Sequence, residues 1–182
     1  MTILRVDGLS KRYPAFCLRD VSFSIEEGRV MGLIGRNGAG KTTTIKSILR
    51  LVRPDGGTVQ FLGKPLDMDA SALRREAGYV SGDLCYYPRK RLSQLTAVTK
   101  SFYPSWDDKK YEALLHRFSL DEGKRICELS AGMKVKYQLA CALSHGAKLL
   151  ILDEPTSGLD PVSRDDLLDL LRTLCEQGGV SI

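Results

Sequence analysis

The stretch Gly35-Arg36-Asn37-Gly38-Ala39-Gly40-Lys41-Thr42 decides the fold of this chain. It matches the pattern G-x-x-x-x-G-K-[ST], directly after an apolar run at 30–34 and directly before a helical pattern. The glycines let the backbone curl so that successive N–H groups face one point, and the following helix adds its positive end. Strand, loop and helix in this order predict a phosphate-binding loop and disfavour the alternative, a chance glycine-rich turn.

The loop residues have distinct expected roles in binding a nucleotide. Lys41 would reach the β- and γ-phosphates, and the hydroxyl of Thr42 would bind Mg²⁺. The predicted nucleotide contacts in this segment are Gly35, Arg36, Asn37, Gly38, Ala39, Gly40, Lys41, Thr42 and Thr43.

Two acidic residues, Asp153 and Glu154, end a second apolar run at 149–152. A buried strand would deliver Asp153 toward a bound metal ion and leave Glu154 at its tip. A carboxylate in that position can accept a proton from an attacking water, so the pair indicates hydrolysis, with Glu154 as the catalytic residue. The alternative is a pair of acids that only cap the end of a strand.

Hydrophobic periodicity predicts an α/β protein. Alternating residues at 2–6, 21–25 and 58–62 predict half-exposed strands, whereas the unbroken apolar runs at 30–34 and 149–152 predict strands buried on both faces. Apolar spacing over 45–52, 111–118 and 167–174 predicts helices. We therefore expect a parallel core flanked by helices, a small antiparallel sheet near the N-terminus and a mainly helical insert over 84–145.

Composition narrows the class of protein. The 182 residues are 43% hydrophobic, which suits one well-buried domain. The net charge of +5 comes from scattered short basic groups, typical of a solvated face. The five cysteines form no C-x-x-C pair and predict reduced cytosolic thiols, and the N-terminus predicts no export signal. No apolar stretch approaches the ~18 residues of a membrane span, so we expect a soluble protein.

Further motifs carry a resemblance to one family. Leu129-Ser130-Ala131-Gly132-Met133 resembles the signature motif of ATP-binding-cassette (ABC) proteins, usually written LSGGQ. The segment Ser157-Gly158-Leu159-Asp160 resembles their D-loop, and Tyr13 stands 28 residues before Lys41, where the family places an aromatic residue that stacks on adenine. Over nearly its whole length the chain resembles the nucleotide-binding domain of a bacterial ABC transporter.

The resemblance implies a function and partners. It implies a P-loop NTPase fold, ATP and Mg²⁺ as cofactors, and ATP hydrolysis coupled to transport by a single cassette domain over 1–182. Two ATP molecules would be sandwiched in a homodimer or a heterodimer with another ABC ATPase subunit, each contacted by Ser130, Ala131, Gly132 and Asp160 across the interface. A transmembrane permease would hold this cytoplasmic dimer on the inner face of the membrane, and no nucleic-acid partner is expected.

Three departures from the family pattern affect these expectations. Ala131 and Met133 replace the usual glycine and glutamine of the signature. The position of the family's loop glutamine is Gly82, so we expect the next residue, Asp83, to help hold Mg²⁺. The sequence stops at Ile182, before the family's switch histidine, so we expect a C-terminally truncated cassette that binds ATP and hydrolyses it poorly.

The segment 84–118 is rich in aromatic residues. We expect Phe102 and Tyr111 in the core of the helical insert, and Tyr86 and Tyr87 in a groove for the permease; stacking of single-stranded nucleic acid is the alternative. The run from Phe102 to Asp107 resembles a segment of subunits that accompany drug-efflux permeases, which favours export.

Other functions fit the sequence less well. ABC ATPases of chromosomes carry long coiled coils, and those of ribosomes carry two cassettes, whereas this chain has one cassette of ordinary spacing. A non-catalytic nucleotide-binding fragment remains a third reading. The signature motif disfavours P-loop kinases and GTPases, and the sequence has no N-K-x-D guanine motif.

Overall fold

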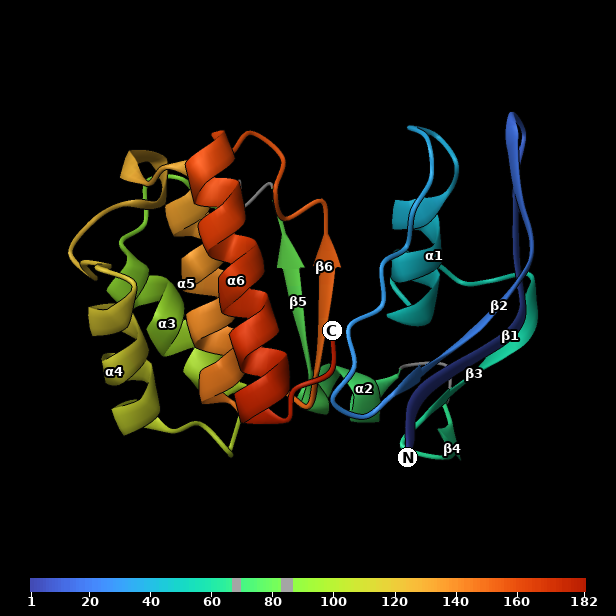
Figure 1. Ribbon diagram of the computed structural model, residues 1–182, viewed down its shortest axis with the longest axis horizontal. Coiled ribbons are helices and arrows are strands. Elements are labelled where there is room, and N and C mark those ends of the chain that lie inside the picture. Colours follow the sequence, from blue (N-terminus) through green and yellow to red (C-terminus); the bar gives the residue numbers. More distant parts are fainter. Residues whose placement is uncertain (67–69, 83–86) are drawn as a thin grey trace. The chain divides into compact units, whose positions relative to one another are not determined.

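The computed structural model describes residues 1–66, 70–82 and 87–182. The chain divides into two compact units (Figure 1). Unit 1 comprises Met1–Arg75 and Leu174–Ile182, and unit 2 comprises Glu76–Thr173. Two helices, α2 (Ser71–Glu76) and α6 (Pro161–Gly178), contribute residues to both units.

Unit 1 contains an antiparallel sheet and one helix. The sheet is formed by β1 (Thr2–Tyr13), β2 (Phe16–Glu26), β3 (Gly56–Phe61) and β4 (Lys64–Pro65), in the order β2-β1-β3-β4. The helix is α1 (Lys41–Ile48). Apolar side chains of the strands, among them Leu4, Val6 and Val59, are buried in the core of this unit. The predicted strands at 2–6, 21–25 and 58–62 and the predicted antiparallel sheet are confirmed.

The apolar run at 30–34 is not the doubly buried strand that its composition predicts. No strand is assigned to it, and the side chain of Ile34 is 95% exposed. Its backbone is joined to the end of the chain, because Met31 N–H donates to Ile182 O and Ile182 N–H donates to Arg29 O. An apolar composition favours burial, but a strand also requires a ladder of backbone partners, and here the ladder is reduced to this pair of bonds.

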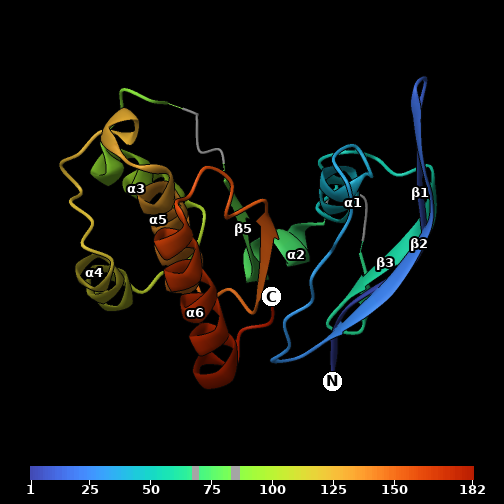
Figure 2. The same ribbon diagram turned by 45° about the horizontal axis from the view of Figure 1, so that its top comes forward.

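Unit 2 combines a parallel strand pair with helices. The strands β5 (Ala77–Ser81) and β6 (Leu149–Asp153) pair in parallel, with Ser81 beside Asp153 at their ends. The helices α3 (Leu92–Ser101), α4 (Asp108–Arg117) and α5 (Ala131–Ser144), with the short 3₁₀ helix η1 (Ile126–Glu128), lie on one side of this pair (Figures 1 and 2). The predicted parallel pairing and α/β class are confirmed.

Helix α5 packs directly on β5 through small residues. A Cβ built on Gly78 would overlap the Cβ of Ala142 and would lie 2.9 Å from Leu150 Cδ2. Strand and helix are therefore held at a separation that only glycine permits at position 78.

Hydrogen bonds between buried hydroxyls join the helices α3, α4 and α5 of unit 2. The hydroxyl of Thr96 lies 2.6 Å from that of Tyr111 and 3.1 Å from that of Tyr137, which come from α4 and α5. Burial raises the pKa of both tyrosines, so they remain neutral partners. Tyr111 is buried as predicted.

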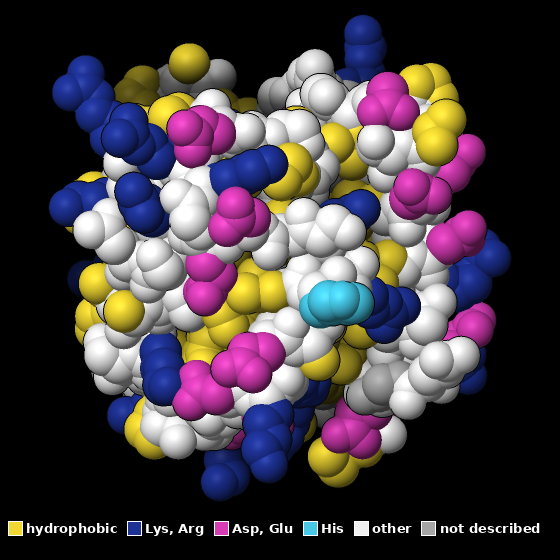
Figure 3. Space-filling model, turned by 90° about the vertical axis from the view of Figure 1, so that its left-hand side faces the viewer, with side chains coloured by type: hydrophobic (Ala, Val, Ile, Leu, Met, Phe, Trp, Pro, Cys, Tyr) yellow, Lys and Arg dark blue, Asp and Glu magenta, His cyan; other side chains and the backbone are white. Residues whose placement is uncertain are grey.

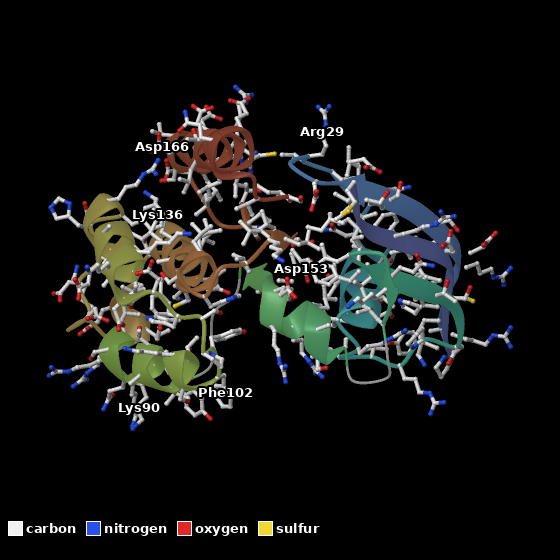
Figure 4. The ribbon with its side chains drawn as sticks, turned by 90° about the horizontal axis from the view of Figure 1, so that it is seen from below. Arg29, Lys90, Phe102, Lys136, Asp153 and Asp166 are labelled. Atoms are coloured by element: carbon white, nitrogen blue, oxygen red, sulfur yellow. The ribbon has the colours of Figure 1, made fainter. Side chains whose placement is uncertain are left out.

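The prediction of a core position for Phe102 is wrong. Its side chain is 72% exposed, and it lies at the outer side of unit 2 (Figure 4). Phe102 is the C-cap of α3, six residues after the buried Thr96. At about 100° per residue it is turned about 120° away from Thr96 around the helix axis, so it lies off the buried face.

Within the described residues, no helix combines the length and the apolar character needed to span a bilayer. Residues 17, 127, 141 and 175 are cysteines with free thiols, and Cys85 lies outside the described residues.

We expect Gly78→Ala to lower the free energy of unfolding by about 1–3 kcal/mol, because the added methyl group overpacks the contact between β5 and α5. Urea unfolding would measure this change. Gly56→Ala is a suitable control, since its Cβ would make an ordinary contact 3.9 Å from Ser10 Cβ. Equal stability of the two variants would contradict the prediction.

Candidate nucleotide-binding and hydrolytic sites

The predicted phosphate-binding loop lies in unit 1, immediately before α1. Its backbone turns at Gly38, with φ of 81°, and at Gly40, with φ of 99°, and both angles favour glycine. Lys41 Nζ donates to Gly35 O at 2.9 Å and to Arg36 O at 3.2 Å. The ammonium group therefore lies within the curve of the loop, where its charge can attract an anion.

Gly40 is constrained by its neighbours as well as by its backbone angle. A Cβ at this position would lie 2.8 Å from Phe16 Cζ and 2.9 Å from Leu18 Cδ1, both on β2. Gly40 is also the N-cap of α1 and has no side chain to cap it, so the positive end of the helix faces the loop.

The hairpin of β1 and β2 in unit 1 carries the predicted adenine-stacking residue, Tyr13. Tyr13 pairs with Phe16 across the β1–β2 turn, and cross-strand partners share a face of the sheet. Tyr13 is 38% exposed, and Lys11 Nζ lies 5.7 Å from the centroid of its ring. The structure thus brings Tyr13 and the loop together through Phe16.

Asp153 lies at the end of β6 in unit 2 (Figure 4). Tyr79 Oη donates to Asp153 Oδ2 at 3.4 Å, and the N–H of Gly82 donates to Asp153 O at 3.1 Å. Burial raises the pKa of Tyr79, and the charge of Asp153 raises it further, so the phenol remains a donor. The strand ends therefore hold Asp153 through both its side chain and its backbone.

Glu154 adopts a left-handed backbone conformation with φ of 50°. Such angles cost free energy for a non-glycine residue and persist where the surroundings enforce them. Here Ser157 N–H donates to Glu154 O at 3.0 Å, closing a turn. The Glu154 side chain is exposed beyond the strand end, as predicted.

Gly82 packs against this turn. A Cβ at Gly82 would overlap the carbonyl oxygen of Glu154, so the position that the family resemblance assigns to a glutamine has no room for a side chain here. Asp83, the predicted metal ligand, lies outside the described residues.

The signature residues begin α5 in unit 2. Ser130 is the N-cap of the helix, and its Oγ accepts a hydrogen bond from Met133 N at 3.2 Å. The D-loop lies beside them, since a Cβ on Gly132 would be 3.5 Å from Leu159 Cδ2, and one on Gly158 would be 4.0 Å from Ala131 Cβ.

Asp160 caps the next helix, α6. Its carboxylate accepts hydrogen bonds from Ser163 N at 3.0 Å and from Ser163 Oγ at 2.6 Å. These bonds hold the pKa of Asp160 below its usual value.

Sequence reasoning missed Gln138, whose side-chain amide bonds to the backbone of Ser81. The available signal was a lone amide in a largely apolar helical segment between Tyr137 and Leu139.

A pocket of about 220 Å³ lies between β5 and the helices α3 and α5. Tyr79, Val98, Tyr103 and His145 are among its lining residues, and the rings of Tyr103 and His145 stack 3.9 Å apart. Burial lowers the pKa of His145, which favours a neutral imidazole.

Charged side chains of both signs are interspersed on the face shown in Figure 3. A continuous basic surface, which would favour nucleic acid, is not seen on that face.

Comparison with known proteins identifies the family. The ABC transporter family matches residues 18–157, and the chain belongs to it. It is 34% identical over 154 residues to the ABC transporter ATP-binding protein YtrB of Bacillus subtilis, covering 85% of this chain and 52% of YtrB. The chain thus spans about half the length of that relative.

The names of other relatives include both directions of transport. The Nod factor export ATP-binding protein I of Burkholderia orbicola is 35% identical, with 98% of this chain and 61% of that protein covered. The phosphonates import ATP-binding protein PhnC 1 of Rhodopseudomonas palustris is 33% identical, with 98% and 71% covered. A solved ATP-binding subunit of an ABC transporter has a TM-score of 0.82 at 32% identity, covering 98% of this chain and 78% of that structure.

We expect Gly40→Ala to weaken ATP binding, because its methyl group would displace the loop from Phe16 and Leu18. The affinity for a fluorescent ATP analogue should fall about tenfold, the effect of a displacement that costs about 1.4 kcal/mol. Gly28→Ala is the matched control, since Gly28 also has a positive φ of 64° but a Cβ there meets nothing within 4 Å. The same affinity in both variants would show that the packing of Gly40 does not matter for binding.

Proposed function

We propose that the chain is the ATP-binding and ATP-hydrolysing subunit of a transporter, as its family membership supports. The observation that carries this proposal is the loop before α1, where Lys41 lies within a glycine-rich curve at the positive end of a helix. Oxygens of a triphosphate would replace the carbonyl oxygens that Lys41 now contacts, while Tyr13 would stack on the adenine ring.

We propose Mg²⁺ as the second cofactor, on the basis of the donors present. Thr42 and Asp153 offer hard oxygen ligands, which Mg²⁺ prefers. No group of three or more candidate ligand side chains occurs in the described parts of the chain. Mg²⁺ is usually held by one or two protein oxygens together with the phosphates. When bound, the ion would neutralise charge on the phosphates. A contribution from Asp83 remains part of the proposal.

Hydrolysis is proposed to depend on Glu154. Its exposed carboxylate follows the strand that carries Asp153, and the N–H of Ser157 closes a turn on its backbone carbonyl. A carboxylate there can orient a water and accept its proton as the water attacks the γ-phosphate.

A dimer is proposed because the signature end of α5 is available to a second nucleotide. Ser130 is exposed at the N-terminal end of a 14-residue helix, and the D-loop lies alongside. Such a helix end attracts anions, so it could close on ATP held by another copy or a related subunit. In this arrangement Ser130, Ala131, Gly132 and Asp160 serve the partner's ATP.

The permease is the proposed membrane partner, and it would hold the subunit at the cytoplasmic face. Tyr87, Val98 and Phe102 are exposed, and Tyr87 and Val98 also line the pocket beside α3. This apolar surface suits a helix of a partner protein. Tyr86, the other residue predicted for this groove, lies outside the described residues.

Export is the direction we favour, on the segment that starts at Phe102. The single-cassette organisation over 1–182, with a helical subdomain near 84–145, is likewise our proposal. Its support is that α3, α4 and α5 all fall between Leu92 and Ser144.

Lys41→Ala should reduce the affinity for ATP by about 10- to 100-fold, since a hydrogen bond to a charged group contributes about 1.5–3 kcal/mol. Titration with a fluorescent ATP analogue measures the change. Lys46→Ala removes the same charge from the last turn of the same helix and should leave the affinity unchanged. If Lys41→Ala binds as tightly as the wild type, the proposed phosphate site is wrong.

Glu154→Gln should bind ATP without cleaving it, because the amide keeps the shape of the carboxylate but cannot accept a proton. In the full natural protein it should accumulate as a dimer with ATP and Mg²⁺, observable by size-exclusion chromatography. Glu112→Gln, an exposed position on α4, is the control and should behave as the wild type. A Glu154→Gln protein that stays monomeric with ATP argues against the sandwich dimer.

A further inference from the structure

Gln138 on α5 forms two hydrogen bonds to a single backbone position. Ser81 N–H donates to Gln138 Oε1 at 3.0 Å, and Gln138 Nε2 donates to Ser81 O at 2.7 Å. The same Nε2 also donates to Lys134 O at 3.3 Å, within its own helix. An amide with its oxygen and nitrogen both engaged has one orientation.

This pair of bonds continues the sheet at the end of β5. Along a parallel strand, successive residues direct their N–H and C=O groups to opposite edges. Gly82 N–H points toward β6, where it donates to Asp153 O, so the groups of Ser81 point to the other edge. At that edge the Gln138 amide supplies both the acceptor and the donor that a further strand would otherwise offer to Ser81.

The bonded backbone leads directly to the hydrolytic residue. Gly82 follows Ser81, and the carbonyl oxygen of Glu154 packs against it so closely that a side chain is excluded. Glu154 holds a left-handed φ of 50° at this contact. A shift of Ser81 would therefore move Gly82, and Gly82 would in turn displace the backbone of Glu154.

The other end of α5 carries the signature residues. Ser130 caps the helix eight residues before Gln138, which is about 12 Å at a rise of about 1.5 Å per residue. One helix thus connects the Ser130 end with the turn that holds Glu154.

We propose that Gln138 is a positioning residue for ATP hydrolysis. It fixes the backbone of Ser81 and Gly82 against Glu154 and transmits the position of the Ser130 end of α5 to the Glu154 carboxylate. This role rests on the proposed function of Glu154.

The test is a kinetic series in the full natural protein. Gln138→Met keeps the length of the side chain and removes both hydrogen bonds to Ser81, together with the one to Lys134 O. Its kcat should fall about 10- to 100-fold, as expected when a reacting group is misplaced by a fraction of an ångström. Its KM for ATP should stay unchanged, since Tyr13 and Lys41 are untouched.

The control variant is Lys136→Ala. Because each helical residue advances about 100°, Lys136 projects from α5 on nearly the opposite side from Gln138, two residues further along the helix. It should keep the wild-type kcat and KM.

Gln138→Glu supplies a readout that a purely structural role would not produce. A carboxylate can accept from Ser81 N–H but repels Ser81 O, whereas a protonated carboxyl can both donate and accept. The kcat of Gln138→Glu relative to wild type should therefore rise as the pH falls from about 8 to about 5.5, toward the carboxyl pKa near 4.3. Amide hydrogen exchange at Ser81 should also be faster in Gln138→Met.

The outcomes separate this role from the proposed function. Absence of turnover in the wild type would overturn the proposed function and this role together. Wild-type kcat in Gln138→Met, or a pH-independent kcat ratio for Gln138→Glu, would overturn the role of Gln138 alone. The free energy of unfolding of Gln138→Met gives the fraction of that variant that is folded. If the lower folded fraction accounted for the whole loss of kcat, the role of Gln138 would also be overturned.

Discussion

The contact between Gly78 of β5 and Ala142 of α5 determines how the functional groups of unit 2 are arranged. With no side chain at position 78, the helix rests directly on the strand, and one helical turn away Gln138 meets Ser81. Parallel pairing then places Asp153 beside Ser81. A wider separation of strand and helix would leave the Gln138 amide unable to reach the backbone of Ser81. The contacts at this strand end therefore depend on the close spacing of β5 and α5.

In unit 1, too, a glycine permits a close packing contact, here at the phosphate-binding loop. Gly40 lets Phe16 and Leu18 approach the start of α1, and Phe16 is also the cross-strand partner of Tyr13. A glycine chosen for its backbone angle thus also sets the distance between the loop and the hairpin that carries Tyr13. The two properties of glycine, its range of φ and its small volume, act at one residue.

Sequence reasoning predicted most of what depends on local pattern. The glycine-rich motif, the Asp153–Glu154 pair and the alternating strands all have signals within a few residues, and the structure places α1 and β6 where the motifs require them. Composition misplaced the run at 30–34, because apolar character says nothing about which segments supply the partner strands. Phe102 was misjudged because its aromatic character favours burial, whereas its position at the end of α3 turns it off the buried face. The roles of Gly82 and Gln138 depend on contacts between residues 57 or more positions apart, which no local pattern encodes.

The close contact between Gly82 and the Glu154 carbonyl oxygen limits the routes by which this protein can change. Any single replacement at position 82 introduces a Cβ into occupied space, so the glutamine that the family resemblance implies at this position cannot be accommodated without a further change. The turn from Glu154 to Ser157 would have to move first, and that turn carries the residue on which hydrolysis is proposed to depend. A side chain at position 82 and the present course of this turn therefore exclude each other, so the two can change only together.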